Sequence, residues 1–510
     1  MIGTTYSTSH YEEFEKTGSK EIFEDVIDKM ILEGISGMNE SFRNVISNLS
    51  RDKKRMTILS LLDKDLNLFK RIKALTDKNI NKMDHIKDII LMLREYVKVG
   101  EVEKKKFGEV MTPLELVKEM LATLPEEVWS NPNLKWLDPA NGTGPYPIMV
   151  IYKLMKGLES WEPDAEKRYK HIIENMIYVC ELQPKNMFLY MCAVDPFDTY
   201  KLNIYTGSFL EEGFDFHMKN VWGVDKFDVV VGNPPYNAPM NKKTKQGTTG
   251  NFIWDKFVMK SVENLIKNGY LCFVHPPGWR KPNSGKSKTI DVWNTMSNLQ
   301  LLYLEIHSIK DGLRVFGAGT RYDFYLLQNK KVDSQTTIKT EDGNIHKLDI
   351  RDWSFLPNKN FTDIHKILKK DTDECCNIIY NRTNYGADKS HVSRVQDDVF
   401  LHPVIHATNK SGIRYVYSSL NDRGHYGVSK VIFGDSGIND VVIDIQGNYA
   451  MSQHAMAIQV DSMNEAELLK KALLSDKFQE ILDALCYSNF GVDWKIFQNF
   501  KKDFYLEFLN

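Results

Sequence analysis

The stretch Trp136-Leu137-Asp138-Pro139-Ala140-Asn141-Gly142-Thr143-Gly144 places a glycine-rich turn between a short apolar run and a helix-like segment that continues to about Leu158. Glycine lets the backbone approach a ligand closely, and the free N–H groups at a helix start favour an anionic or carboxylate group. The turn lacks the Gly-Lys-Ser/Thr of a P-loop and the Gly-x-Gly-x-x-Gly of a dinucleotide fold. It therefore predicts a ligand site at a strand-to-helix turn and disfavours ATP and NAD.

Further apolar runs follow this turn and alternate with helical stretches. They are Ile177–Cys180, Phe227–Val231, Tyr270–Val274 and Phe324–Leu327. Continuous apolar strands separated by helices indicate a parallel sheet that is covered on both faces. We therefore predict an α/β, Rossmann-like domain over residues 106–335, with an extra helix between Asp164 and Met176.

The two ends of the chain have a different character. Residues 1–105 carry apolar side chains at helical spacing, which predicts a helical N-terminal region. Residues 336–510 are richer in short strand patterns with Gly, Asn and Asp turns, and we expect a separate mixed α/β domain there. With 510 residues, 42% of them hydrophobic, each of these parts can bury a core of its own.

Composition excludes several classes of protein. Lys and Arg total 66 against 68 Asp and Glu, which excludes a uniformly basic nucleic-acid binder but not local basic clusters. Six cysteines are too few for a disulfide scaffold, and none stands in a metal-ligand array, so we expect no metal site. No run approaches about 18 apolar residues and no secretory signal is visible, so we expect a cytoplasmic protein without membrane contact.

The most specific pattern is Asp228–Tyr236, in which an apolar run ends in Asn233-Pro234-Pro235-Tyr236. The side-chain carbonyl of Asn233 and the backbone carbonyl of Pro234 can together accept both hydrogens of one planar amino group. Those bonds draw the nitrogen lone pair out of conjugation and make the nitrogen more nucleophilic. Tyr236 offers a face for stacking a base, which reaches such a site only when flipped out of its helix. These four residues are the predicted catalytic group.

Asn-Pro-Pro-Tyr at 233–236, downstream of Asp-Pro-Ala-x-Gly-Thr-Gly at 138–144, resembles amino-group methyltransferases that use S-adenosylmethionine. The segment Phe107–Pro113 resembles the one before the cofactor turn in gamma-class N6-adenine DNA methyltransferases of restriction–modification systems. The resemblance implies methyl transfer to a flipped-out adenine in double-stranded DNA. It also implies that residues 336–510 form the target-recognition domain. A cognate restriction endonuclease as a partner is left open.

The same resemblance implies a set of cofactor contacts. They are Thr112, Pro113, Asp138, Ala140, Gly142, Gly144, Glu181, Ser208, Phe209 and Asn233. Glu181 ends the second predicted strand, where a carboxylate can hold ribose hydroxyls. Ser208 departs from the family, which often has Asp near this position to bind the adenine amino group of the cofactor. Phe209 is expected to pack on that adenine ring.

Basic segments near the predicted site are candidates for phosphate contacts. One is the loop 241–250, and the other comprises Arg280, Lys281, Lys286 and Lys288. In the C-terminal part the candidates are Arg382, Lys389, Arg394, Arg414, Arg423 and Lys430. His275 is expected to be a hydrogen-bonded loop histidine and Trp279 a core residue, while Phe316 or Tyr322 is a candidate second aromatic face for the base.

Two alternatives stay open. One is a methyltransferase that acts on another amino group, such as cytosine N4, an RNA base or a protein glutamine. The other is a non-catalytic DNA-reading subunit, against which the intact cofactor turn and the intact Asn233–Tyr236 segment argue.

Overall fold

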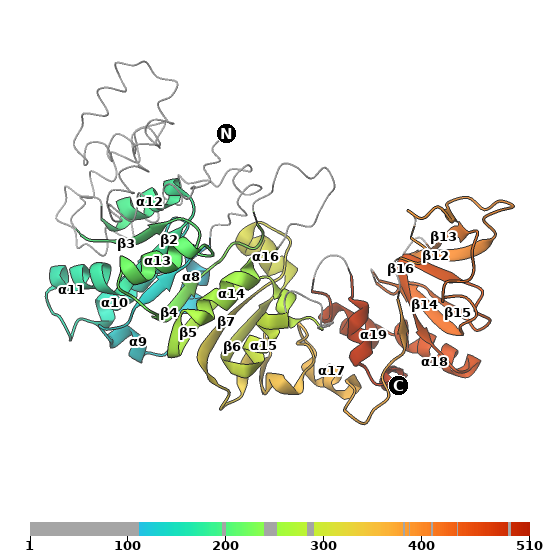
Figure 1. Ribbon diagram of the computed structural model, residues 1–510. Coiled ribbons are helices and arrows are strands. Elements are labelled where there is room, and N and C mark those ends of the chain that lie inside the picture. Colours follow the sequence, from blue (N-terminus) through green and yellow to red (C-terminus); the bar gives the residue numbers. More distant parts are fainter. Residues whose placement is uncertain are drawn as a thin grey trace, which may run out of the picture.

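The computed structural model describes residues 112–195, 200–238, 252–282, 290–380, 383–386, 388–409, 412–435, 437–487 and 491–509. The expected N-terminal helical region, residues 107–111 and the basic loop 241–250 lie outside these residues, as do Lys286, Lys288 and Arg382. Figure 1 shows two sheets, one in the catalytic region and one near the C-terminus, with helical segments between them.

Nine strands of the described residues form the first sheet, in the order β3-β2-β1-β4-β5-β7-β6-β8-β9. They are β1 Trp136–Asp138, β2 Ile177–Glu181, β3 Asn203–Thr206, β4 Phe227–Gly232, β5 Leu265–His275, β6 Leu299–His307, β7 Tyr322–Lys331, β8 Thr336–Lys339 and β9 Ile345–Leu348. The four predicted apolar runs and the run at Trp136 are all confirmed as strands, and β3 and β6 join them. This is the Rossmann-like arrangement that the sequence predicts.

The sheet is not wholly parallel, and on this point the prediction is wrong. β3, β2, β1, β4 and β5 are parallel neighbours, whereas β7 runs antiparallel to both β5 and β6. The connection from β6 to β7 is a single short helix, α16 Ile309–Phe316. It returns the chain beside β6 in the opposite direction, whereas a parallel neighbour needs a longer crossover.

β8 and β9 carry the sheet past residue 335, where the sequence patterns change. Tyr303, Leu304 and Glu305 of β6 pair in parallel with Thr337, Ile338 and Lys339 of β8. The edge of the first sheet therefore lies after Leu348, and the boundary predicted at residue 335 cuts through this sheet.

Helices cover both faces of this sheet (Figure 1). They are α8 Leu114–Leu121, α9 Glu127–Ser130, α10 Pro145–Gly157, α11 Ala165–His171, α12 Pro184–Val194, α13 Glu212–Asn220, α14 Trp254–Glu263, α15 Ile290–Asn298 and α16. Neighbouring residues of β4 show the two faces, since Val229 and Val231 belong to one hydrophobic core and Val230 to the other. This double burial explains why the run Val229–Val231 is apolar.

The extra helix predicted between Asp164 and Met176 is confirmed. Asp164 caps α11 by accepting hydrogen bonds from the backbone N–H groups of Glu166 and Lys167, and a π-helical turn Ile172–Met176 completes the segment. This insertion separates the turn after β1 from the end of β2 in sequence but leaves the two strands paired side by side.

The C-terminal sheet has the order β11-β13-β12-β16-β14-β15, with β10 paired to β16. Its strands are β10 Ile378–Ile379, β11 Val392–Ser393, β12 His402–Asn409, β13 Gly412–Ser418, β14 Lys430–Gly434, β15 Val441–Asp444 and β16 Ala450–Gln459. The remaining elements are α17 Phe361–Ile367, α18 Met463–Leu473, α19 Asp476–Ala484 and short 3-10 turns at Pro277–Arg280, Ile350–Asp352, Trp494–Asn499 and Phe504–Phe508. The short strand patterns expected in residues 336–510 are thus confirmed as strands.

Arg280 lies buried at the joint between the first sheet and the C-terminal part. Its guanidinium donates to both carboxylate oxygens of Asp323, at 2.6 and 3.0 Å, and to the carbonyls of Leu356 and Pro357. It also donates to Asn358 Oδ1 at 3.0 Å, and it faces the ring of Tyr487. The side chain therefore holds three distant segments of the chain together.

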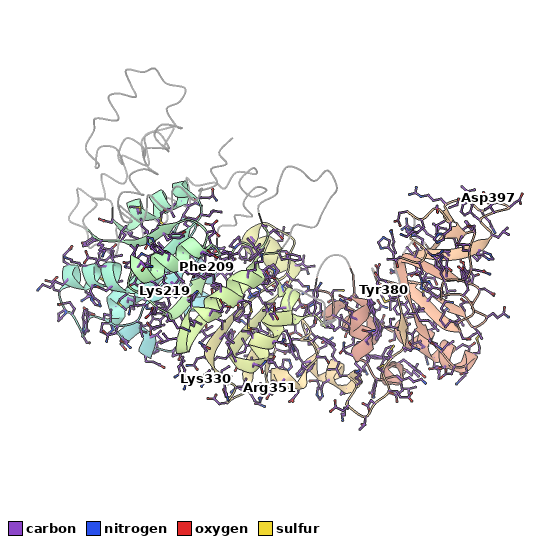
Figure 2. The ribbon with its side chains drawn as sticks, viewed as in Figure 1. Phe209, Lys219, Lys330, Arg351, Tyr380 and Asp397 are labelled. Atoms are coloured by element: carbon purple, nitrogen blue, oxygen red, sulfur yellow. The ribbon has the colours of Figure 1, made fainter. Side chains whose placement is uncertain are left out.

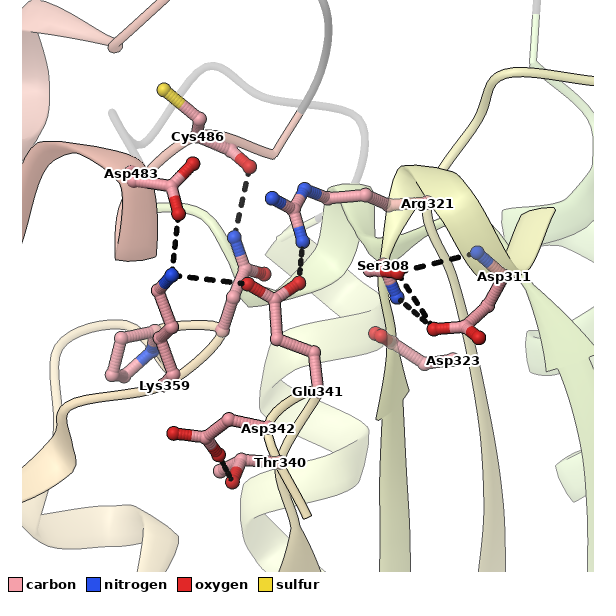
Figure 3. Close-up of polar contacts among 12 residues, drawn as sticks. Ser308, Asp311, Arg321, Asp323, Thr340, Glu341, Asp342, Lys359, Asp483 and Cys486 are labelled. Atoms are coloured by element: carbon pink, nitrogen blue, oxygen red, sulfur yellow. Dashed lines mark hydrogen bonds and ion pairs between the residues drawn. The ribbon is translucent and has the colours of Figure 1, made fainter. Parts of the chain in front are cut away.

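A second ionic group lies at the same joint (Figure 3). Arg321, which precedes β7, forms an ion pair with Glu341, and Lys359 lies between Glu341 and Asp483 of α19. Both Arg321 and Glu341 are nearly inaccessible to water. No helix of the described residues has the length and apolar character needed to cross a lipid bilayer.

Candidate active site

A cavity of about 320 Å³ lies at the carboxyl ends of β1, β2, β3 and β4. Parallel strands present their ends at one edge of a sheet, so residues far apart in sequence meet there. The lining residues are Pro139, Ala140, Gly142, Glu181, Leu182, Gln183, Asn186, Gly207, Ser208, Phe209, Leu210, Glu211, Asn233, Pro234, Pro235, Tyr236, Ile253 and Phe257. Of the predicted residues, Thr112, Pro113, Asp138 and Gly144 are not part of the lining.

The turn after β1 takes its shape from two left-handed glycines. Gly142 has φ +55° and Gly144 has φ +95°, a region in which side chains are strained. A Cβ on Gly144 would lie 2.5 Å from the ring of Tyr190, whereas a Cβ on Gly142 would meet no protein atom within 4 Å. Gly144 thus permits close packing below the turn, and Gly142 leaves open space at the cavity.

Glu181, at the end of β2, is fixed by two backbone hydrogen bonds. Its Oε2 accepts the N–H of Gly142 and its Oε1 accepts the N–H of Gln183, each at 2.7 Å. The carboxylate is only 7% exposed, and each of its oxygens has a further lone pair. Its place on the cavity wall fits a group that offers two hydroxyls, such as a ribose.

Asp138 lies directly behind the cavity and is buried. Its Oδ1 accepts the N–H of Ala140 at 3.0 Å, and Oδ2 has no hydrogen-bond partner among the described residues. Burial raises the pKa of this carboxyl well above its usual value, and the nearby Glu181 raises it further. A Cβ on Gly232 would lie 2.9 Å from Oδ1, so this glycine is what lets the carboxylate lie against β4. An unpartnered buried carboxylate fits an ammonium group on a ligand.

Ser208 and Phe209 both line the cavity. Ser208 Oγ accepts a hydrogen bond from the backbone N–H of Leu210 at 3.2 Å. This bond stabilises the local turn. Phe209 is held by Phe214 and Phe257, with ring centroids 4.8 and 5.5 Å away (Phe209 is labelled in Figure 2). The wall of the cavity at this point is therefore a fixed aromatic surface.

The catalytic loop follows β4 and reaches the same cavity. Asn233 Nδ2 donates a hydrogen bond to Thr112 Oγ1 at 3.1 Å, while Asn233 Oδ1 is buried and has no partner among the described residues. The Tyr236 carbonyl accepts the N–H of Ile253 at 3.2 Å, which ties the end of the loop to the start of α14. Burial raises the pKa of the Tyr236 hydroxyl, so it stays protonated.

Sequence reasoning missed part of the cavity wall. Leu182, Gln183 and Asn186 follow Glu181 directly, and Ile253 and Phe257 belong to the start of α14 and the residue before it. Leu182, Gln183 and Asn186 could have been predicted from the sequence, because they follow the end of a predicted strand. Ile253 and Phe257 could not, since they come after the loop 241–250 and reach the cavity only through the fold.

Two aromatic predictions are settled by packing. His275 stacks on Trp254 at 4.3 Å, with its ring nitrogens close to the Pro276 carbonyl and the Tyr325 hydroxyl. Burial lowers the pKa of His275 to about 4, so it is a neutral structural residue, and Trp279 is fully buried in the core. The core position predicted for Trp279 and the hydrogen bonding predicted for His275 are confirmed, but His275 ends strand β5 and does not lie in a loop.

Phe316 and Tyr322, the two candidates for a second face for the base, pack edge to face at 4.9 Å, and Tyr322 stacks on His307. Neither of them lines the cavity, so the second face stays a prediction.

Two of the predicted DNA contacts are wrong. Arg280 is fully buried in the joint described above, and Lys430 is buried with its ammonium 2.6 Å from Asp444 Oδ2. Burial lowers the pKa of Lys430, and its remaining hydrogen bonds go to the carbonyls of His425 and Val428. Sequence patterns cannot separate such internal cations from surface ones.

Part of the chain is similar to known methylases. Residues 162–316 match the model of the Eco57I restriction-modification methylase family. A Mycoplasma pneumoniae protein described as an uncharacterized adenine-specific methylase is 29% identical over 236 residues, which are 34% of this chain and 55% of that protein. The chain therefore spans about half the length of this relative.

A solved structure extends the likeness in fold to most of the chain. The ATP-dependent Type ISP restriction-modification enzyme LlaBIII bound to DNA has a TM-score of 0.50 at 10% sequence identity, covering 94% of this chain and 43% of that one. At this identity the likeness concerns the fold alone. Residues 162–316, from α11 to α16, are thus similar to the Eco57I restriction-modification methylase family, and the first sheet has a Rossmann-like α/β arrangement.

Proposed function

We propose that this protein is a DNA adenine N6-methyltransferase of restriction–modification type that transfers the methyl group of S-adenosylmethionine to a flipped-out adenine. The observation that supports it most is the single cavity wall shared by Glu181, Gly142 and Asn233. It brings a ribose-binding carboxylate, an open glycine turn and the amide of Asn-Pro-Pro-Tyr to one place.

The cofactor fits the residues that surround this cavity. Glu181 would hold the ribose hydroxyls, Phe209 would lie against the adenine, and Asp138 would face the ammonium of the amino-acid part. When bound, S-adenosylmethionine supplies a methyl group on a positively charged sulfur. The protein then needs no metal or covalent intermediate for the transfer, because its own task is to orient the reactants.

The catalytic loop would activate the target amine through acceptors alone. Asn233 Oδ1 and the Pro234 carbonyl accept the two amino hydrogens, which localises the lone pair on the nitrogen. The nitrogen forms its bond to the methyl carbon while the carbon–sulfur bond breaks, and the nitrogen then releases one proton to water. Tyr236 would stack on the flipped base, a contact worth about 1–3 kcal/mol.

For DNA we propose a row of arginine and histidine side chains on the C-terminal sheet as the reading face. Arg414 of β13, His406 of β12 and His454 of β16 stand on three adjacent strands, since Arg414 and His454 both pair with Ala407. The rings of His406 and His454 are 5.5 Å apart, and Arg394 and Arg414 both act on the pKa of His406, which burial also lowers.

The two arginines of this row are available for phosphates. Arg394 and Arg414 are exposed, and neither has an ion pair within the described part of the chain. An unpaired guanidinium is suited to phosphate and to the edge of guanine. Of the six basic residues that the sequence suggests in the C-terminal part, Arg394 and Arg414 are therefore the best candidates for phosphate contacts.

The test is to incubate the protein with unmethylated DNA and isotopically labelled S-adenosylmethionine, with Asn233→Ala alongside. Mass spectrometry of the digested nucleosides should show labelled N6-methyladenine with the wild type and none with the variant. Labelled N4-methylcytosine would keep the mechanism and change the base. A protein that binds the cofactor but labels no nucleoside would overturn the DNA assignment, and one that binds no cofactor would favour a non-catalytic DNA reader.

A further inference from the structure

The hydrogen bond between Asn233 and Thr112 joins residues from opposite ends of the catalytic region. Asn233 Nδ2 donates to Thr112 Oγ1 at 3.1 Å across 121 positions of sequence. Thr112 is 5% exposed and does not line the cavity. The buried hydroxyl therefore meets the Asn233 amide without being part of the cavity wall.

The surroundings of Thr112 fix which way this bond runs. Tyr146 donates its own hydroxyl hydrogen to Met120 Sδ at 3.2 Å, so the Tyr146 oxygen is left as an acceptor. Thr112 hydrogen-bonds to Tyr146 and thereby lowers its pKa, against the larger effect of burial. A threonine hydroxyl has one hydrogen. Once that hydrogen is given to Tyr146, the Thr112 oxygen can only accept.

This polarity decides the orientation of the Asn233 amide. With Thr112 as an acceptor, the amide must turn its NH₂ group toward Thr112 and its carbonyl the other way. A flipped amide would set two acceptors against each other and leave buried groups unsatisfied, which is unfavourable because neither group recovers the hydrogen bonds it made in water. Asn233 Oδ1 is indeed the buried atom that has no partner in the described part of the chain.

We propose that Thr112 is a positioning residue, whose hydroxyl holds the Asn233 amide with its carbonyl oxygen directed at the target amine. The proposal rests on the proposed function and differs from the cofactor contact that the resemblance implies for Thr112. The helix α8 begins two residues after Thr112, and its Met120 is fully buried and accepts the hydrogen bond of Tyr146. These contacts fix the position of Tyr146, which in turn holds the Thr112 hydroxyl in place.

The two roles are separated by comparing Thr112→Val, which keeps the shape without the hydroxyl, with Thr112→Ser, which keeps the hydroxyl. We expect Thr112→Val to lower kcat about 10- to 100-fold, with KM for S-adenosylmethionine within about twofold of the wild type. Thr112→Ser should restore most of kcat. Thr123→Val is the control, since it removes a half-buried threonine hydroxyl nearby in sequence, which donates to the Met120 carbonyl.

A double variant tests whether Thr112 acts through Asn233. In an Asn233→Ala background, Thr112→Val should cause no further loss of the residual rate. A raised KM with unchanged kcat would instead make Thr112 a cofactor contact and overturn the proposal. An equal loss of kcat in Thr112→Val and Thr123→Val would overturn the proposal, because it would show that Thr112 has only a structural role.

A crystal structure of Thr112→Val gives a readout that does not depend on methyl transfer. The Asn233 side chain should rotate away from its wild-type position in this variant and keep that position in Thr112→Ser. An unchanged Asn233 in Thr112→Val would overturn the positioning role, whatever the substrate is. Absence of methyl transfer by the wild type would count against the proposed function alone.

Discussion

The backbone N–H of Gly142 donates to Glu181 Oε2 at 2.7 Å, so one carboxylate links the turn after β1 to the end of β2. The same carboxylate accepts the N–H of Gln183 through its other oxygen. Glu181 therefore fixes the shape of the cavity wall at this point.

Glu181→Gln should weaken the binding of S-adenosylmethionine about tenfold or more. The amide has one acceptor oxygen, so its NH₂ group must face one of the two backbone N–H groups that the carboxylate now accepts. Isothermal titration calorimetry measures the change. Glu263→Gln, at an exposed position at the end of α14, is the control and should bind like the wild type.

Gly144→Ala should destabilise the protein by about 2 kcal/mol or more. The left-handed backbone costs roughly 1–2 kcal/mol for a residue with a Cβ, and here the Cβ would also lie 2.5 Å from Tyr190. Gly223→Ala is the control, since it also has a positive φ, at +64°, but its Cβ would meet nothing within 4 Å. Chemical denaturation measures the free energy of unfolding of both variants. Gly223→Ala reports the backbone strain alone, so an equal loss of stability in the two variants would contradict the packing argument for Gly144.

Asp138→Asn should stabilise the protein in the absence of cofactor while weakening cofactor binding. Because burial raises the pKa of Asp138, ionising it costs more in the fold than in the unfolded chain. That cost is absent below the unfolded pKa near 3.8 and complete above the raised pKa of the folded state. We expect a Tm gain of a few degrees at neutral pH that vanishes toward about pH 4.

Thermal melts of Asp138→Asn and the wild type from pH 4 to pH 8 measure this difference. A Tm that falls at neutral pH would show that the carboxylate has a stabilising partner in the folded protein. Asp225→Asn, at an exposed position before β4, should leave the Tm unchanged across the range.

Arg280→Ala should cost about 3–5 kcal/mol of stability, because it leaves the fully buried Asp323 carboxylate without its partner. The control is Arg314→Ala, whose side chain is 75% exposed and pairs with Asp311 at the surface. We expect a change within about 0.5 kcal/mol there. A stable Arg280→Ala protein with weakened DNA binding would restore the phosphate-contact role that burial argues against.

Arg394→Ala with Arg414→Ala should weaken DNA binding and make it less dependent on salt. Removing one phosphate-binding side chain should lower the slope of log K against log salt by about 0.9. Binding titrations at several salt concentrations measure this slope, and cofactor binding should stay unchanged. Arg351→Ala, an exposed arginine paired with Asp349 beyond the edge of the first sheet, is the control, and an equal effect there would argue against a dedicated face.

Local patterns were sufficient for the strands and for much of the site. The run Val229–Val231 of β4 is apolar because it is buried on both faces, and the residues after the ends of β4 and β2 reach the cavity in any parallel sheet. The direction of β7 could not be predicted, since it depends on how a short connection folds back. Neither could the burial of Arg280 and Lys430, whose partners Asp323 and Asp444 are recognised only in three dimensions.

The buried joint around Arg280 has a consequence for exchanging the C-terminal region between relatives. Arg280 and Asp323 belong to the first sheet's part of the chain, whereas Asn358 and Tyr487 lie after it, on either side of the C-terminal sheet in sequence. A chimera that grafts a foreign C-terminal region would pair an arginine from one parent with acceptors from another. Such chimeras should fold only when the segments around residues 356–358 and 484–487 come from the same parent as the arginine. The part of the chain that must be exchanged is therefore larger than the C-terminal sheet.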